Sequence, residues 1–212
     1  MKNWSLRRPC RAGLPMAVLL AALSGCMYMN HDETHAPGMD AVVGQSFATV
    51  QDAFLIKDAC IDNFKAKYCS QLQVVQGYYY VKDPHAPGAG SFLRKKLPAD
   101  PQILSTSPEA AARLIWVPKG TRLKVVQLLS RSMGQYRRCW VVYATLPQLP
   151  ADSVAEVPAC LQWAPESAPM WFHAQALPPT PDAPRHDNTT NYDFEDKPPV
   201  PDPAFLIPVP AT

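Results

Sequence analysis

The chain has 212 residues, of which 47% are hydrophobic and 18% charged, and its formal charge is +2. This composition is too apolar for a chain that is disordered throughout. The near-neutral charge argues against a dedicated nucleic-acid binder, which carries a basic excess on one face. The 24 prolines are roughly twice the usual share and argue against a long helical bundle, because an interior proline removes a backbone donor and clashes with the preceding turn.

The first 26 residues have the features of a secretory signal. Four bases precede a short apolar run at 14–23. This run is too short to span a bilayer, because a spanning helix needs about 20 apolar residues. Leu23-Ser24-Gly25-Cys26 follows and resembles the lipobox of bacterial lipoproteins. The resemblance implies that residues 1–25 are a lipoprotein signal peptide and that Cys26 carries the lipid. The alternatives are an ordinary signal peptide with a chance cysteine, or a short membrane anchor.

The same resemblance implies a location. Several acyl chains hold a protein stably on a membrane, whereas one chain holds it only marginally. The second residue of the mature chain is Met27 rather than Asp. By the same resemblance, this implies delivery to the outer membrane, where the protein faces the periplasm. Removal of residues 1–25 takes away four bases and no acid, so the mature chain has a net charge of −2.

Residues 26–40 are predicted to be a flexible lipidated tether, because 27–40 show neither strand nor helix periodicity. His31 and His35 are four residues apart but lack the Glu that a zinc-protease motif requires directly after the first His. We therefore predict no metal site and no cofactor. The strand-like runs that follow are rich in Val, Tyr, Trp and Leu and lie at 46–57, 71–81, 113–117, 121–130, 138–146 and 159–163.

These runs predict that residues 41–175 form a mainly β periplasmic domain, either a small antiparallel barrel or a sandwich. One short helix is expected at 107–113, with Ser107 as its cap and Pro108 at its first position. Pro118 and Gly120 predict a type II turn that joins 114–117 and 121–129 into a hairpin. Residues 113–146 resemble the middle of a bacterial SH3-like barrel.

A proline-rich acidic tail is predicted for residues 176–212, which carry ten prolines and a net charge of −4. Such a segment favours extended polyproline rather than a helix or a central strand. We therefore expect the core to lie within 41–175, and a cut after Gln175 to shift the melting temperature by only a few degrees. Phe205-Leu206-Ile207 is an apolar island in this tail that can dock back on the domain.

Four cysteines remain once Cys10 leaves with the signal and Cys26 is lipidated. An even number in an oxidising compartment predicts disulfides. Pairing Cys60 with Cys69 and Cys139 with Cys160 closes the shortest loops, but the sequence leaves the connectivity open.

No catalytic residue is predicted, since no nucleophile elbow or phosphate-binding loop occurs. Four aromatic residues are candidates for partner contact: Tyr78, Tyr80, Trp163 and Trp171. The basic clusters 94–96 and 137–138 are either solvated or face an anionic partner such as peptidoglycan or lipid headgroups.

The sequence thus predicts a lipid-anchored, non-catalytic binding or assembly module that contacts the membrane through Cys26 and binds an envelope protein or peptidoglycan. Nucleic acid is not an expected partner, and the oligomeric state is open. The alternative is a periplasmic inhibitor or immunity lipoprotein that blocks a toxin or a lysozyme-like enzyme, with the loop 82–100 as its plug.

Overall fold

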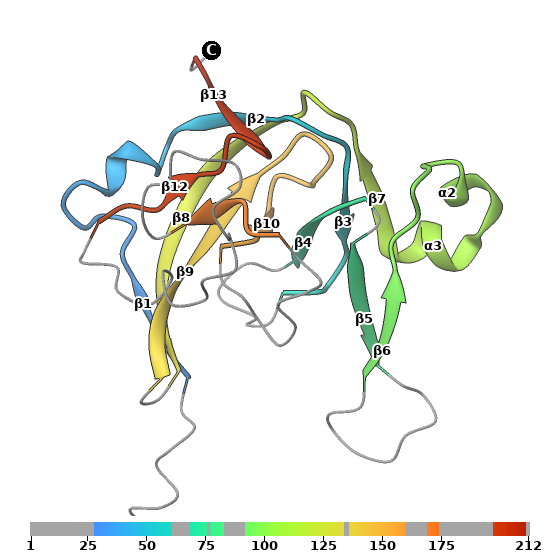
Figure 1. The fold of residues 1–212 in the computed structure, drawn as a ribbon, viewed down its shortest axis with the longest axis horizontal. Helices are drawn as coiled ribbons and strands as arrows, with labels where there is room; N and C mark the ends of the chain where they lie inside the picture. Colours follow the sequence, from blue (N-terminus) through green and yellow to red (C-terminus); the bar gives the residue numbers. More distant parts are fainter. Residues whose placement is uncertain are drawn as a thin grey trace, which may run out of the picture.

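The computed structural model describes residues 28–60, 68–75, 77–82, 92–133, 136–159, 169–173 and 197–210. Over these residues the protein is mainly β, as predicted, with one strongly curled sheet that resembles a barrel (Figure 1). The strands are β1 (Tyr28–Asp32), β2 (Ser46–Thr49), β3 (Ala53–Ile56), β4 (Tyr68–Val74), β5 (Tyr78–Lys82), β6 (Phe92–Lys96), β7 (Leu114–Val117), β8 (Arg122–Met133), β9 (Tyr136–Thr145), β10 (Ser153–Val157), β11 (Phe172–His173), β12 (Val200–Pro201) and β13 (Leu206–Val209). The helices are η1 (Met39–Ala41), α2 (Ile103–Thr106) and α3 (Pro108–Arg113).

The curl comes from a long, bent antiparallel ribbon. Strand β2 pairs with β8, and β3 pairs with β7, in the same register on both sides of a bend, from Ser46↔Lys124 to Ile56↔Leu114. The ribbon bends where residues 49–52 face residues 118–121. At this corner Gly120 has a φ of 81°, which residues with a Cβ rarely adopt, and the N–H of Lys119 donates to Asp52 Oδ1 at 2.7 Å.

The hairpin predicted for 114–129 is therefore wrong, although its turn is present. Thr121 N–H donates to the carbonyl of Pro118, and Gly120 N–H donates to the carbonyl of Thr49. These bonds make the turn redirect the chain rather than reverse it, so β7 pairs with β3 and β8 pairs with β2 instead of with each other.

The remaining strands connect the two ends of this ribbon. In the described part of the chain, the path β8-β9-β10-β4-β3 leads from one end to the other, and β10 and β4 are parallel neighbours. Strand β10 was not predicted from the sequence, and residues 160–163 of the strand predicted at 159–163 lie outside the described residues. The short helix is confirmed: the side chain of Ser107 accepts a hydrogen bond from Ala110 N–H at 3.2 Å, and Pro108 occupies the first turn of α3.

The main core fills the inside of the curled sheet. Its members share near-complete burial and include Leu55, Leu72, Val125, Leu128, Val142 and Trp171, each 0% exposed. A second cluster lies on the outer side of β3 and β7, where Phe54 packs edge-on against Trp116 with ring centroids 5.0 Å apart. Strand β3 is thus buried on both faces.

The C-terminal segment belongs to the domain, which corrects the predicted core boundary at residue 175. Strand β13 pairs antiparallel with β2, and Leu206, only 1% exposed, lies in the main core with Phe205. Val50 N–H donates to the carbonyl of Phe205, and hydrogen-bonded pairs alternate along an antiparallel ladder, so the nitrogen of Pro208 points away from β2. Proline content therefore did not prevent this segment from forming an edge strand.

Candidate interaction surfaces

The N-terminal strand is attached to the barrel along its whole length, which corrects the predicted flexible tether from residue 28 onward. Strand β1 pairs with the last five residues of β8. Side chains reinforce the pairing: Gln127 Nε2 donates to Asp32 Oδ2 at 3.1 Å, and Ser130 Oγ donates to Glu33 Oε1 at 2.9 Å. Cys26, the predicted lipidation site, lies outside the described residues, yet only Met27 separates it from β1.

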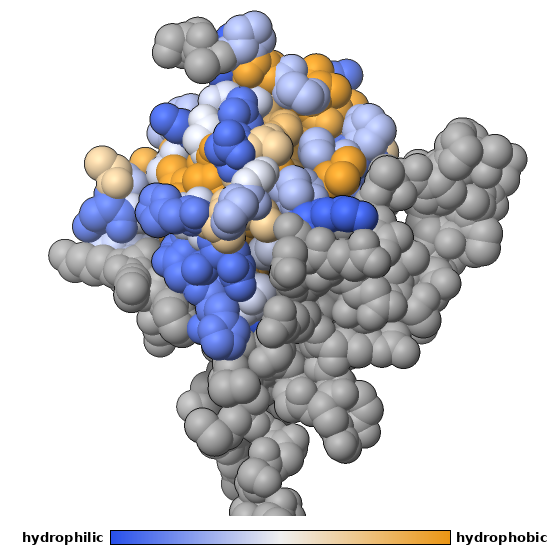
Figure 2. Space-filling view, turned by 90° about the vertical axis from the view of Figure 1, so that its left-hand side faces the viewer, coloured by the Kyte–Doolittle hydropathy of each residue, from blue (hydrophilic) through white to orange (hydrophobic). Residues whose placement is uncertain are grey.

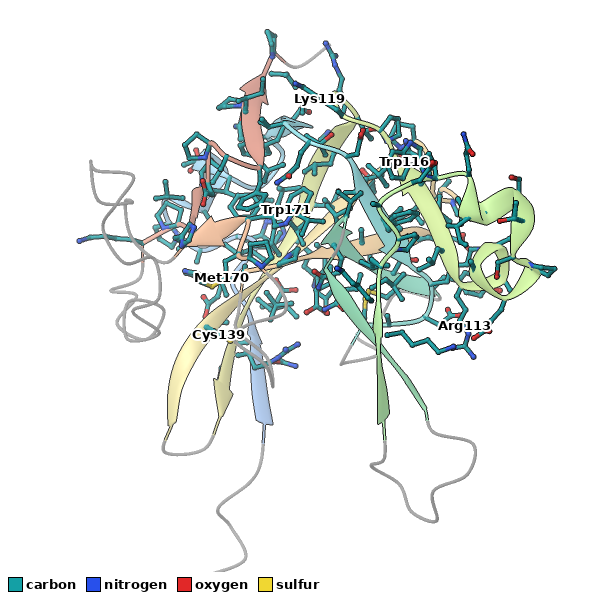
Figure 3. All side chains as sticks on the ribbon, turned by 45° about the vertical axis from the view of Figure 1, so that its right-hand side comes forward. Arg113, Trp116, Lys119, Cys139, Met170 and Trp171 are labelled. Carbon is teal, nitrogen blue, oxygen red and sulfur yellow. A yellow bond between two sulfur atoms is a disulfide. The ribbon has the colours of Figure 1, made fainter. Side chains whose placement is uncertain are left out.

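Three elements extend from the barrel in one direction, and we call them the proximal legs. They are the start of β1, the connected ends of β8 and β9, and the β5–β6 ribbon, which all point downward in Figures 1 and 3. β1 and the end of β8 are paired, whereas β5 and β6 form a separate two-stranded sheet. The chain therefore enters the barrel on the side from which the ribbon projects.

The β5–β6 ribbon combines aromatic and basic residues. Its register places Tyr78 opposite Lys96, Tyr79 opposite Lys95 and Tyr80 opposite Arg94. With Lys82 the two strands carry four bases and no acid. Sequence patterning predicted β5 as part of a longer strand and did not predict β6.

Two contacts attach the ribbon to the barrel. Leu97, which follows β6, is 2% exposed in the second cluster. Its N–H donates to the carbonyl of Gly77 at 2.7 Å, which continues the β5–β6 pairing by one more pair of residues. Lys95 Nζ forms an ion pair with Glu109 on α3 at 2.5 Å. This hydrogen bond, together with the charge of Lys95, lowers the pKa of Glu109 below 4.5. The Glu109 carboxylate is exposed, so the pair positions the ribbon rather than stabilising the fold.

The opposite end of the barrel, which we call the distal end, consists of the corner 118–121, the start of β8 and strand β13. Lys119 and β13 lie together at the top of Figure 3. The side chains of Lys119, Arg122 and Lys124 are exposed, and Ile207 is 47% exposed. On the face shown in Figure 2, apolar side chains gather towards this upper end and hydrophilic ones towards the lower end. The distal end thus offers positive charge beside an apolar side chain.

The cysteines agree with the predicted framework where the structure describes them. Cys60 and Cys69 form a disulfide with their Cα atoms 5.6 Å apart, which confirms that predicted pair. Cys139 is 2% exposed and also disulfide-bonded. Cys160 lies outside the described residues, so its pairing with Cys139 stays a prediction.

The four aromatic candidates fall into different environments. Tyr78 and Tyr80 lie on β5 in the projecting ribbon. Trp171 is 0% exposed and stacks on Phe205 with ring centroids 5.5 Å apart, so the prediction that it contacts a partner is wrong. Figure 3 shows Trp171 at the centre of the molecule. Trp163 lies outside the described residues.

Sequence reasoning missed a buried polar pair that fastens the C-terminal segment. His173 Nε2 lies 3.2 Å from Asp202 Oδ2, and the two residues are 9% and 1% exposed. Asp202 Oδ1 also accepts from Ala204 N–H at 2.9 Å, and Asp202 N–H donates to the carbonyl of Trp171 at 2.8 Å. Because the pair adjoins the Trp171–Phe205 stack, we infer that it holds the C-terminal segment against the core. Its members are 29 positions apart in the sequence, so no local pattern predicts the pair.

His31 lies on strand β1 and His35 in the turn after it, so the two are not on one helix face. Within the described ranges no group of three or more His, Cys, Asp or Glu side chains is arranged to hold a metal ion. No helix in that part of the chain is both long and apolar enough to cross a bilayer. No protein-family model, curated protein or solved structure matches this chain.

Proposed function

We propose that the chain is a lipid-anchored, non-catalytic module of the cell envelope, held in the outer membrane by acyl chains on Cys26 and facing the periplasm. The observation that carries the proposal is the position of β1, which begins two residues after Cys26 and pairs with β8. An anchor at this position adjoins the barrel directly. The proximal legs then face the bilayer, and the distal end faces away from it.

The distal end is the proposed binding surface for an envelope protein or for peptidoglycan. Lys119, Arg122 and Lys124 suit an acidic partner, since complementary charge steers association and selects partners. The exposed Ile207 adds an apolar contact beside them. Within this proposal, the barrel is an SH3-like scaffold whose rigidity fixes the orientation of the distal end.

The test is cross-linking in intact envelopes followed by purification of the chain. We expect one envelope component to be captured by the wild type and to be reduced at least about tenfold by the double change Lys119→Glu and Arg122→Glu, the size of effect that truncation of a central contact produces. Arg113→Gln on α3 is the matched control, because Arg113 is an exposed base on another side of the barrel. Equal capture by all three proteins would contradict a distal binding surface.

The alternative function, a periplasmic inhibitor or immunity protein, is favoured by one observation. The ribbon formed by β5 and β6 holds the ends of residues 83–91, which belong to the predicted plug. Its four bases suit the paired carboxylates of a glycosidase cleft. Inhibition of a lysozyme-like enzyme that is abolished by Lys96→Glu and unaffected by Lys119→Glu would favour this alternative over the binding module.

A further inference from the structure

We propose that the β5–β6 ribbon rests on the anionic lipid surface of the bilayer that holds the anchor, so that the protein has two membrane contacts rather than one. The inference rests on the proposed lipidation of Cys26, and it adds the ligand of a surface that the proposed function leaves unassigned. The ligand class is the phosphate of anionic lipid headgroups.

The ribbon carries an excess of positive charge. The ten residues of β5 and β6 include Lys82, Arg94, Lys95 and Lys96 and no acid. Lys95 is paired with Glu109, whereas Lys96 is exposed. Juxtamembrane bases are attracted by the negative surface potential of anionic lipids, by about fivefold in affinity for each base near the surface.

The ribbon also combines tyrosines with bases in its strand register. Tyr78, Tyr79 and Tyr80 face Lys96, Lys95 and Arg94 in the antiparallel register, so each tyrosine position has a base opposite it. Tyrosine is enriched where membrane and water meet, because its ring is apolar and its hydroxyl is polar. A ribbon that pairs these two residue types therefore suits the headgroup region better than bulk water.

The ribbon projects from the same side of the barrel as the start of β1 (Figures 1 and 3). The start of β1 and the ribbon are separate legs that extend from the barrel in the same direction (Figures 1 and 3). An anchor attached just before β1 brings this side of the barrel to the bilayer. Two contacts hold the ribbon in this direction: Leu97 is buried in the second cluster, and Lys95 pairs with Glu109 on α3. The bases of the distal end lie on the other side, which makes Lys119 an internal reference.

The experiment uses the lipidated full-length product, reconstituted into vesicles and treated with a membrane-impermeant amine reagent. Mass spectrometry reports the labelling of Lys96 relative to Lys119. In vesicles that contain phosphatidylglycerol, we expect the relative labelling of Lys96 to be at least about fivefold lower than in vesicles of phosphatidylcholine alone. High salt should restore it, since salt screens exposed charges.

Two double variants sharpen the test. Lys82→Gln with Arg94→Gln should raise the labelling of Lys96 in anionic vesicles, whereas Arg122→Gln with Lys124→Gln at the distal end should leave it unchanged. Equal labelling of Lys96 in both vesicle types would overturn the proposal. Protection of Lys96 that arises only when peptidoglycan fragments or a protein partner are added would overturn it too.

Vesicle flotation separates this inference from the proposed lipidation. An acylated chain floats with both vesicle types. If Cys26 is not acylated, the chain should not float with phosphatidylcholine vesicles, and the proposed anchor fails. Flotation with the anionic vesicles alone would then still support the ribbon contact, and flotation with neither vesicle would overturn both.

Discussion

The barrel and the β5–β6 ribbon are both built from strands, yet they differ in what lies against those strands. Strand β3 has neighbours on both edges and clusters on both faces, so Ala53, Phe54 and Leu55 are 0% exposed. The ribbon is a separate two-stranded sheet, and an isolated pair of strands is marginally stable by itself. The barrel therefore determines whether the chain folds, and the ribbon is available for contacts outside the domain.

We therefore expect that loss of core contacts in the barrel unfolds the protein, whereas substitution of ribbon residues changes its interactions. Removal of residues 176–212 is expected to have the largest effect. It deletes β13 and takes Phe205 and Leu206 out of the main core, and it leaves Trp171 without its stacking partner. The truncated chain should fail to fold cooperatively, as measured by circular dichroism and a thermal melt. A shift of only a few degrees would show that the core closes without the C-terminal segment.

A single change in β13 should have a smaller but still clear effect. Leu206→Ala empties a core position that is 1% exposed and should cost about 2–5 kcal/mol in the free energy of unfolding. The neighbouring Ile207→Ala is the control, since a surface position that is 47% exposed should change stability by about 0.5 kcal/mol or less. Denaturant unfolding measures both, and equal losses would contradict the assignment of Leu206 to the core.

The disulfide between Cys60 and Cys69 should contribute about 2–3 kcal/mol, because it restricts the unfolded chain; the value is modest because the loop that it closes is short. Cys60→Ser together with Cys69→Ser tests this by denaturant unfolding. The double variant is needed because a single change leaves a free thiol. A stability equal to that of the wild type would mean that the register of β3 and β4 holds this region without the bridge.

Loss of the buried carboxylate of Asp202 should cost about 1–3 kcal/mol, because Asn in its place keeps the shape but changes the hydrogen bonds to His173 and Ala204. A matched control is Asp152→Asn, at an exposed position. Thermal melts of the two variants should differ by several degrees. If they coincide, the His173–Asp202 pair is not what fastens the C-terminal segment.

The smallest effect is expected where the ribbon meets α3. Glu109 has a lowered pKa, so the folded form binds fewer protons than the unfolded form near pH 4.5. The Lys95–Glu109 contact should therefore hold above that pH and weaken as the pH falls through the lowered pKa. Glu109→Gln should remove this pH dependence with no measurable change in the melting temperature. Amide chemical shifts of β6 during a pH titration report the contact, and shifts that do not respond to pH in the wild type would contradict it.

Local signals in the sequence were reliable where the structure depends on neighbouring residues. The cap at Ser107, the positive φ at Gly120 and the short Cys60–Cys69 loop were all predicted from spacing and residue type. The mainly β fold followed from the same kind of pattern. These features need no information about distant parts of the chain.

Predictions failed where pairing is long-range. The proline count of the tail does not reveal the four-residue strand β13, because its pairing partner β2 is more than 150 positions away. The corner at 118–121 contains the Pro and Gly that are also typical of a hairpin turn, so the sequence does not separate a corner from a hairpin. The hydrogen bonds to residues 49–52 make it a corner. The prediction that Trp171 contacts a partner fails because its stacking partner, Phe205, comes from the distant C-terminal segment.

We propose that a lipid anchor at Cys26 is joined directly to the barrel through β1. Mass spectrometry of the N-terminal peptide from protein purified from bacterial membranes tests it most directly. We predict a mature chain that begins at Cys26 and carries acyl chains, and a Cys26→Ser variant that carries none. A mature, unacylated chain that begins elsewhere, or an acylated Cys26→Ser product, would contradict the anchor and with it the proposed orientation of the barrel.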